Sequence, residues 1–232
     1  MKKLVAHIVS EIDAMNNPYF VALRDGAFTR DDFVETQVQF LFAVKHFHRP
    51  MAVLAAKIST EQLRLPILRN VWEEVGEGDP SKSHEATFLT LLDRLGGLTP
   101  SDIVQYTRWP EVDMFNATLS GICNTRGAHF SAAMLGIIEL MFKDFSTWLR
   151  RDIADQGWLP KSNIAHYATH ETLDERHSDD LFAVAQEAWG QSAQRRLLVE
   201  RGLRLGAHTF DSLYRGLFLA RQRRWRNLNT PG

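Results

Sequence analysis

Residues 170–177 read His-Glu-Thr-Leu-Asp-Glu-Arg-His, and three of them shape the interpretation of the whole chain. His170, Asp174 and His177 recur at helical spacing, so on an α-helix their side chains lie within roughly 40° of one another. Two imidazoles and a carboxylate on one face are typical of half of an iron, manganese or zinc site. Polar surface helices also carry such triads by chance, so the metal interpretation depends on ligands elsewhere in the sequence.

The composition is that of an ordinary globular protein. The chain has 232 residues, 44% apolar and 24% charged, and its net charge is -1, which gives no global attraction to nucleic acid or to an anionic membrane. Cys123 is the only cysteine, so no disulfide forms within one chain. The sequence lacks both a signal-peptide pattern and an apolar run of about 20 residues. We therefore expect a cytoplasmic protein without a membrane or nucleic-acid partner.

Apolar residues recur at helical spacing along the chain, whereas no segment alternates with the period of a strand. Caps and turn residues predict helices at about 2–15, 30–57, 60–75, 83–95, 111–124 and 128–154. Ser162 or Asn163 is expected to cap the next helix, which carries residues 170–177, and a final helix is expected to end near Trp225. We predict one all-α domain over residues 1–232, a bundle of seven or eight helices with its core at roughly 15–220.

Three further features supply side chains that bind metals. Glu139 is the only charged residue in the apolar run 132–142, and an ionised carboxylate buried there requires a partner such as a cation. Glu73 and Glu74 end a predicted helix, where acidic residues oppose the helix dipole, and His84 begins the next one. Each feature alone is compatible with an ordinary surface side chain. Together with residues 170–177 they offer carboxylates and imidazoles in a set that suits two iron or manganese ions.

The order Asn70-x2-Glu-Glu-x-Gly76, then His84, an isolated Glu139 and His-x3-Asp-x2-His resembles that of the heme-oxygenase-like diiron oxidase and oxygenase family. Relatives of this family include the chlamydial protein that associates with death domains. The wider fold includes thiaminase II-like and pyrroloquinoline quinone synthase-like proteins. The resemblance implies a single heme-oxygenase-like helical domain, and it implies the metal ligands Glu73, His84, Glu139, His170, Asp174 and His177. Alignment on Asn70 and Gly76 favours Glu73 over Glu74, and the loop before His84 is longer than in the chlamydial relative.

The resemblance also implies an activity, that of a non-heme diiron oxygenase or oxidase. Its cofactor would be two Fe2+ ions, with manganese fitting the same ligands, and its substrates dioxygen and a small molecule. Reactions of the family are N-oxygenation of an amine and oxidative C–C cleavage of an amino acid or a fatty acid. An external reductant and a homodimer are compatible with this chemistry. Because a helix with three inward ligands is destabilised without its metal, we expect residues 164–180 to be more mobile in the metal-free chain.

Two alternatives remain open from the sequence. A metal-independent enzyme of the thiaminase or quinone-synthase type would bind a small aromatic cofactor in the same cavity, but it leaves the six ligand-type residues unexplained. Cys123, the candidate nucleophile, lies in no matching motif and is expected to be a buried, inert thiol. A non-catalytic interaction protein on the same fold predicts a large exposed apolar patch.

His46 and Arg49 are the candidate substrate-binding residues. They lie three residues apart near Pro50, where a helix kink is expected, and could share one helical face. An arginine there would recognise a substrate carboxylate through paired hydrogen bonds. The alternative is ordinary surface polarity at a helix bend.

Overall fold

A computed structural model describes residues 1–223, except for the side chains of residues 169–173, and in that part the regular structure is helical throughout. The α-helices are α1 (Lys2–Ile12), α2 (Pro18–Arg24), α3 (Arg30–Lys57), α4 (Glu61–Glu74), α5 (His84–Gly96), α6 (Pro100–Ile103), α7 (Pro110–Thr125), α8 (Ala128–Asp155), α9 (Ala165–Trp189) and α10 (Ala193–Ala220). Short 3-10 helices at Ala14–Asn16, Pro80–Lys82 and Lys161–Asn163 complete the described chain.

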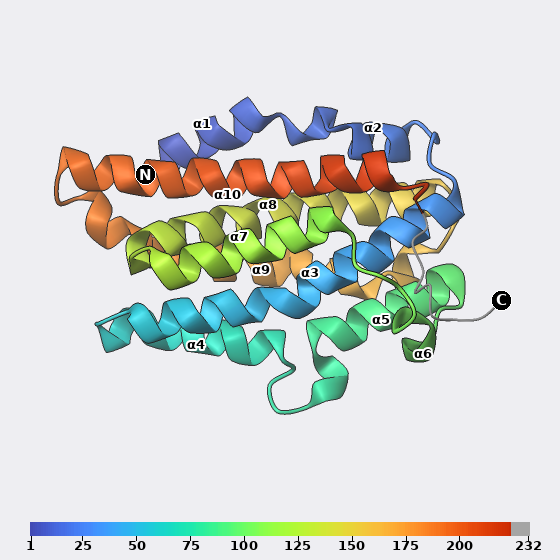
Figure 1. Cartoon of the computed structure of the whole chain (residues 1–232), viewed down its shortest axis with the longest axis horizontal. Coiled ribbons are helices and arrows are strands. Elements are labelled where there is room, and N and C mark those ends of the chain that lie inside the picture. Colours follow the sequence, from blue (N-terminus) through green and yellow to red (C-terminus); the bar gives the residue numbers. More distant parts are fainter. Residues whose placement is uncertain (224–232) are drawn as a thin grey trace.

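The long helices α3, α7, α8, α9 and α10 run along the long axis of the molecule (Figure 1). Helix α8 lies between α9 and α10 and packs extensively against both. Helices α1 and α2 cover α10 on one side of the bundle, and α4 and α5 cover α3 on the other. One continuous cluster of buried apolar residues fills the space between these layers. The bundle therefore surrounds α8, the helix that carries the isolated glutamate of the sequence.

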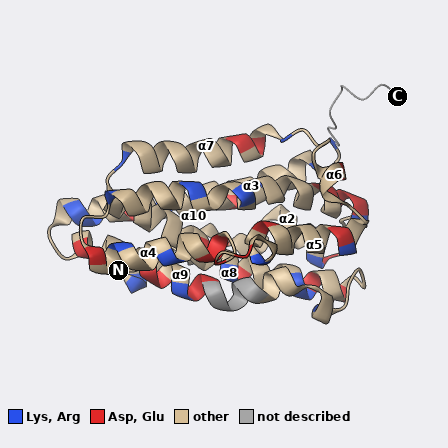
Figure 2. Cartoon of the chain, turned by 90° about the horizontal axis from the view of Figure 1, so that it is seen from below, with Lys and Arg blue, Asp and Glu red and all other residues tan. Residues whose placement is uncertain are grey.

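The predicted all-α fold is confirmed, and the helix count is higher than the expected seven or eight. The described part holds ten α-helices, because Pro18–Arg24 and Pro100–Ile103 form short helices of their own. Helix α3 continues through Pro50. In Figure 2 acidic and basic residues are interspersed along the helices, in keeping with the net charge of -1. No helix in the described residues is long and apolar enough to span a membrane.

Three helix boundaries differ from those predicted. Helix α1 ends at Ile12 because Asp13 adopts a left-handed conformation, with φ 50°. The cap expected at Ser162 or Asn163 is wrong, because Lys161–Asn163 form a separate 3-10 turn and α9 begins after Ile164. Helix α10 ends at Ala220, before the expected Trp225.

Polar contacts and aromatic rings join the outer helices to the core. The Asn17 side chain accepts a hydrogen bond from the Tyr19 amide and donates to the carboxylate and carbonyl of Asp211, which ties the start of α2 to α10. In the core the rings of Phe145 on α8 and Phe210 on α10 stack with centroids 5.0 Å apart. These contacts hold α2 and α8 against α10.

Close packing of α10 on α8 depends on Gly206. A Cβ atom added there would lie 2.3 Å from the Met134 carbonyl oxygen and 2.7 Å from the Ile137 side chain. The Met134 carbonyl belongs to the backbone of α8 and cannot rotate away as a flexible side chain can. Any larger residue at position 206 must therefore push the two helices apart.

We predict that Gly206→Ala destabilises the protein by about 1–3 kcal/mol, because overpacking outweighs the better helix propensity of alanine. A calorimetric scan should then show a melting temperature lower by several degrees. Gly121→Ala is the matched control, since Gly121 lies in α7 with nothing within 4 Å of its added Cβ, and it should stabilise the fold. Equal effects of the two variants would contradict this account of the packing.

Candidate metal centre

Glu139 lies near the middle of α8 with only 3% of its surface exposed. Nearly all of its neighbours on the helix are buried apolar residues, so the carboxylate lies in an apolar environment. One turn earlier, Gly136 allows α9 to approach, since an added Cβ would lie 3.1 Å from the Cβ of Leu181. The close approach brings the ligand-type side chains of α9 to Glu139.

Helix α4 turns Glu74 toward this centre. Its buried residues are Ile67, Asn70 and Glu74, which follow one another at helical spacing and define the inner face. The apolar residues Leu65, Leu68, Trp72 and Val75 lie instead on the outer face, where they are 37–62% exposed. The apolar residues of this helix therefore lie on both faces, and the inward face is partly polar.

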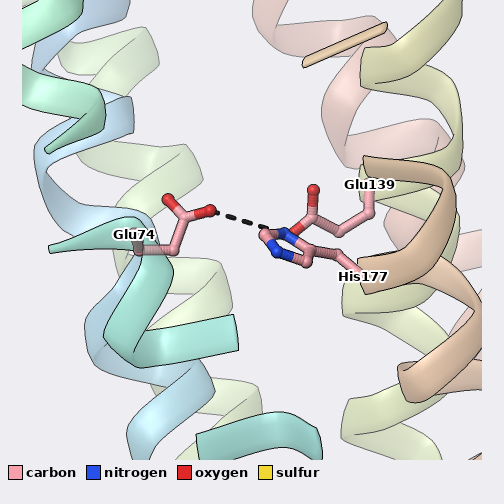
Figure 3. A group of neighbouring side chains, drawn as sticks. All are labelled: Glu74, Glu139 and His177. Atoms are coloured by element: carbon pink, nitrogen blue, oxygen red, sulfur yellow. Dashed lines mark ion pairs between the residues drawn. The ribbon is translucent and has the colours of Figure 1, made fainter. Parts of the chain in front are cut away.

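Glu74, Glu139 and His177 meet between α4, α8 and α9 (Figure 3). Each offers one ligand atom, and these atoms all lie within 4.8 Å of one another. The Nδ1 atom of His177 is 3.6 Å from Glu74 Oε1 and 3.7 Å from Glu139 Oε1. All three side chains are buried, so the group is shielded from bulk water.

His84 and Asp174 extend this group. His84 begins α5, where the Ser83 hydroxyl accepts a hydrogen bond from the amide of Ala86 and so caps the helix. Its Nδ1 atom lies 2.9 Å from Glu74 Oε2. Asp174 is fully buried on α9, one turn before His177.

Glu73 lies beside the group rather than in it. Its Oε2 atom accepts a hydrogen bond from the guanidinium of Arg176 and lies 2.8 Å from Nε2 of His177. Arg69 lies one turn earlier on α4, with Nε 3.9 Å from Glu73 Oε1. Glu73 thus contacts the outer nitrogen of the His177 ring, whereas Glu74 and Glu139 face the inner one.

Burial and mutual repulsion raise the proton affinity of the carboxylates. Desolvation raises the pKa of Glu139, and desolvation together with the nearby Glu74 charge raises that of Asp174. Burial opposes protonation of both histidines, but the surrounding carboxylates outweigh it and raise the pKa of His84 and of His177. Without a cation, these carboxylates and imidazoles therefore hold protons to higher pH than the same groups do in water.

The donor atoms of this group suit iron. Carboxylate and imidazole are the ligands that iron and manganese take in proteins, and a carboxylate can bridge two ions. Among the described residues, Glu139 Oε1 and His177 Nδ1 are buried and make no hydrogen bond, although both belong to strongly polar groups. Buried polar atoms without partners are rare, and a bound cation would satisfy both.

The remaining predicted site residues lie elsewhere or are not described. The side chain of His170 falls outside the described residues, although its backbone belongs to α9. His46 Nε2 lies 2.7 Å from the Ser120 hydroxyl on α7, so this half-buried ring is engaged between two helices. Burial, followed by the Arg49 charge, lowers the pKa of His46, and Arg49 itself is exposed. Neither His46 nor Arg49 lines the cavity beside Glu139.

That cavity has a free volume of about 40 Å³ and a nearly apolar wall. Glu74, His84 and Glu139 lie on its polar side. The rest of the lining consists mainly of phenylalanines: Phe40, Phe47, Phe115, Phe142 and Phe210. A small molecule held there would present an apolar body to the rings and one end to the carboxylates.

Glu74 is the residue that the sequence alone does not single out. The family resemblance favours Glu73, from its spacing to Asn70 and Gly76. The signal that could identify Glu74 is its spacing from Ile67 and Asn70, which share its face.

Solved structures with the same fold include proteins of several kinds. A domain of unknown function with a heme oxygenase-like fold from Shewanella denitrificans matches with a TM-score of 0.77 and 15% identity, over 95% of this chain and 91% of that one. A TenA homologue from P. horikoshii matches with a TM-score of 0.70 and 13% identity, over 94% of this chain and 96% of that one. These similarities establish the fold.

Sequence comparison is more specific. A 4-aminobenzoate synthase from Nitrosomonas europaea is 22% identical over 197 residues, covering 80% of this chain and 78% of the relative. Residues 34–209 match the model of a family described as iron-containing redox enzymes. This match covers most of the chain and includes every candidate metal ligand named above. The chain therefore belongs to the iron-containing redox enzyme family, on a heme oxygenase-like fold.

Proposed function

We propose that this protein is a non-heme diiron oxygenase or oxidase that acts on a small, largely apolar molecule. The observation that carries the proposal is the buried group of Glu74, Glu139 and His177 beside an apolar cavity, in a chain of an iron-containing family. The ligands that we propose are Glu74, His84, Glu139, His170, Asp174 and His177. Glu74 replaces Glu73 in this set because its carboxylate faces the other ligand atoms.

Two iron ions held by these residues would supply electrons for the activation of dioxygen. The protein's own contribution is to place and shield the reacting groups. Glu74 on α4 and Glu139 on α8 approach His177 from different helices, so the donors are fixed by the packing of the bundle. The phenylalanine wall excludes water from the polar side of the cavity, which protects reactive species from side reactions.

The cavity favours one substrate class among those of the family. None of the described residues that line it is lysine or arginine, so no fixed cation there pairs with a substrate carboxylate, whether of an amino acid, a fatty acid or an aromatic acid, and the choice between them rests on the apolar wall. Its apolar wall suits an alkyl chain or an aromatic ring, and the similar 4-aminobenzoate synthase is named for an aromatic acid. We therefore favour a fatty acid or an aromatic substrate over an amino acid. Because about 40 Å³ is less than such a molecule needs, the phenylalanine side chains must move on binding.

The interaction-protein alternative has one feature in its favour. Leu65, Leu68, Trp72 and Val75 form an exposed apolar stripe on α4, which suits contact with another protein or with a second copy of the chain. The stripe lies on the opposite face of the helix from Glu74, so partner binding and an iron site are compatible in one molecule.

Iron loading tests the proposal directly. Anaerobic titration of the metal-free protein with Fe2+ should reach about two ions per chain, as expected for a carboxylate-bridged pair. Glu139→Gln should lower this number, because the amide cannot bridge two cations as a carboxylate does. Glu187→Gln, which changes an exposed carboxylate of α9, should leave it unchanged. Wild-type protein that stays folded and takes up no iron would refute the proposal.

Filling the cavity should separate substrate binding from metal binding. Ala43 is 2% exposed and lines the cavity, so Ala43→Leu should reduce oxygen consumption with fatty or aromatic acids by at least about tenfold while iron uptake persists. Ala56→Leu, at an exposed position of the same helix, is the control. A wild-type preference for free amino acids would contradict the substrate class.

The reactivity of Cys123 tests the thiaminase-like alternative. Burial raises the pKa of this thiol to about 11, and the residue does not line the cavity beside Glu139. We predict that at pH 8 a thiol reagent modifies the native chain at least about 100-fold more slowly than the unfolded chain, since the thiolate is the reactive form. Rapid modification of native protein, blocked by a thiamin analogue, would support a nucleophilic cysteine instead.

A further inference from the structure

We infer that Glu73 is a positioning residue, which holds the His177 ring so that its Nδ1 atom faces the metal centre. The inference rests on the proposed function and assigns different roles to two adjacent glutamates. Glu74 would bind metal, whereas Glu73 would orient a histidine that binds metal.

The two ring nitrogens of His177 meet different partners. Nε2 lies 2.8 Å from Glu73 Oε2, at hydrogen-bond distance. Nδ1 lies 3.6 Å from Glu74 and 3.7 Å from Glu139, beyond hydrogen-bond distance but facing both carboxylates. The ring therefore points one nitrogen at a close partner and the other at the cluster.

The chemistry of that contact assigns the proton on Nε2. An ionised carboxylate only accepts hydrogen bonds, so Nε2 must carry the hydrogen that Glu73 receives. When the ring is neutral, its lone pair is then on Nδ1, the atom that faces Glu74 and Glu139. Glu73 thus selects the form of His177 that can donate electrons to a cation in the cluster.

Glu73 is itself held in place by charged side chains from two helices. Arg176, the residue before His177 on α9, donates a hydrogen bond to the same carboxylate oxygen that faces the ring. Arg69 on α4 lies 3.9 Å from the other oxygen and donates to Asp180 on α9 over 2.7 Å. The carboxylate therefore has cationic partners already, and its place is fixed relative to both helices.

A carboxylate that accepts from the far nitrogen of a metal-bound histidine fixes the ring orientation and increases its basicity. Loss of such a partner typically lowers metal affinity by about 10–100-fold without removing the ion. This expectation differs from that for a ligand, whose loss changes how many ions bind. The two roles can therefore be separated by experiment.

The experiment compares Glu73→Ala, Glu73→Gln and Glu74→Gln, with Glu187→Gln as the control, since Glu187 is an exposed carboxylate near the far end of α9. Each variant is titrated anaerobically with Co2+, and the number of ions, the dissociation constant and the visible spectrum are recorded. Glu73→Ala should bind as many ions as wild type, about 10–100-fold more weakly and with a shifted spectrum. Glu73→Gln should lie between, because its amide oxygen still accepts from Nε2, and Glu74→Gln should bind fewer ions.

The inference would be overturned if Glu73→Ala bound fewer Co2+ ions than wild type while Glu74→Gln bound the full number. It would also be overturned if Glu73→Ala bound Co2+ with the affinity and spectrum of the wild type. A second measurement is independent of metal. In 15N-labelled metal-free protein, the Nε2 proton of His177 should give a visible signal that exchanges slowly with water, because Glu73 accepts its hydrogen bond; the signal should be lost to fast exchange in Glu73→Ala and persist in Glu187→Gln. Its absence from the wild type would also overturn the inference. Failure of wild-type protein to bind any metal, with that proton present, would instead count against the proposed function alone.

Discussion

The burial of several carboxylates around His177 is the constraint on which the rest of the structure depends. Glu74, Glu139 and Asp174 come from three helices and lie in an interior that disfavours unpaired charge. These carboxylates in turn raise the pKa of His177 and of His84, so they favour protonation of both rings. Replacing buried charged groups with well-packed apolar residues typically leaves a protein as stable or more stable. Cation binding or catalysis therefore explains the cluster better than stability does.

Helix α4 divides its apolar residues between two faces. Leu63, Ile67 and Val71 pack against the core beside the buried Glu74, whereas Leu65, Leu68 and Trp72 are exposed on the other side. The inner face can therefore offer a carboxylate to the cluster while it still packs against the bundle. The outer stripe is then free to contact another protein, and one helix can serve both purposes.

The fold and half of the site could be predicted from the sequence because their signals are local. Glu139 stands out as the only charge in an apolar helix, and the spacing of Asp174 and His177 fixes a common face whatever surrounds it. The choice between Glu73 and Glu74 is different, since adjacent residues point about 100° apart and only packing decides which one faces inward. The start of α9 after Ile164 was missed for a similar reason, because the preceding 3-10 turn depends on how the loop meets the bundle.

Helix α9 joins these observations. Its inner face carries Asp174 and His177. Ion pairs join the rest of the helix to α4, through Arg176 and Glu73, and to α8, through Glu175 and Lys143. Candidate ligands therefore alternate along the helix with residues that form ion pairs. The exposed ion pairs do not depend on a cation, so they contribute a small stabilisation of α9 whether or not one is bound. The anchoring pairs on α9 thus oppose the loosening that buried, like-charged ligands would otherwise cause.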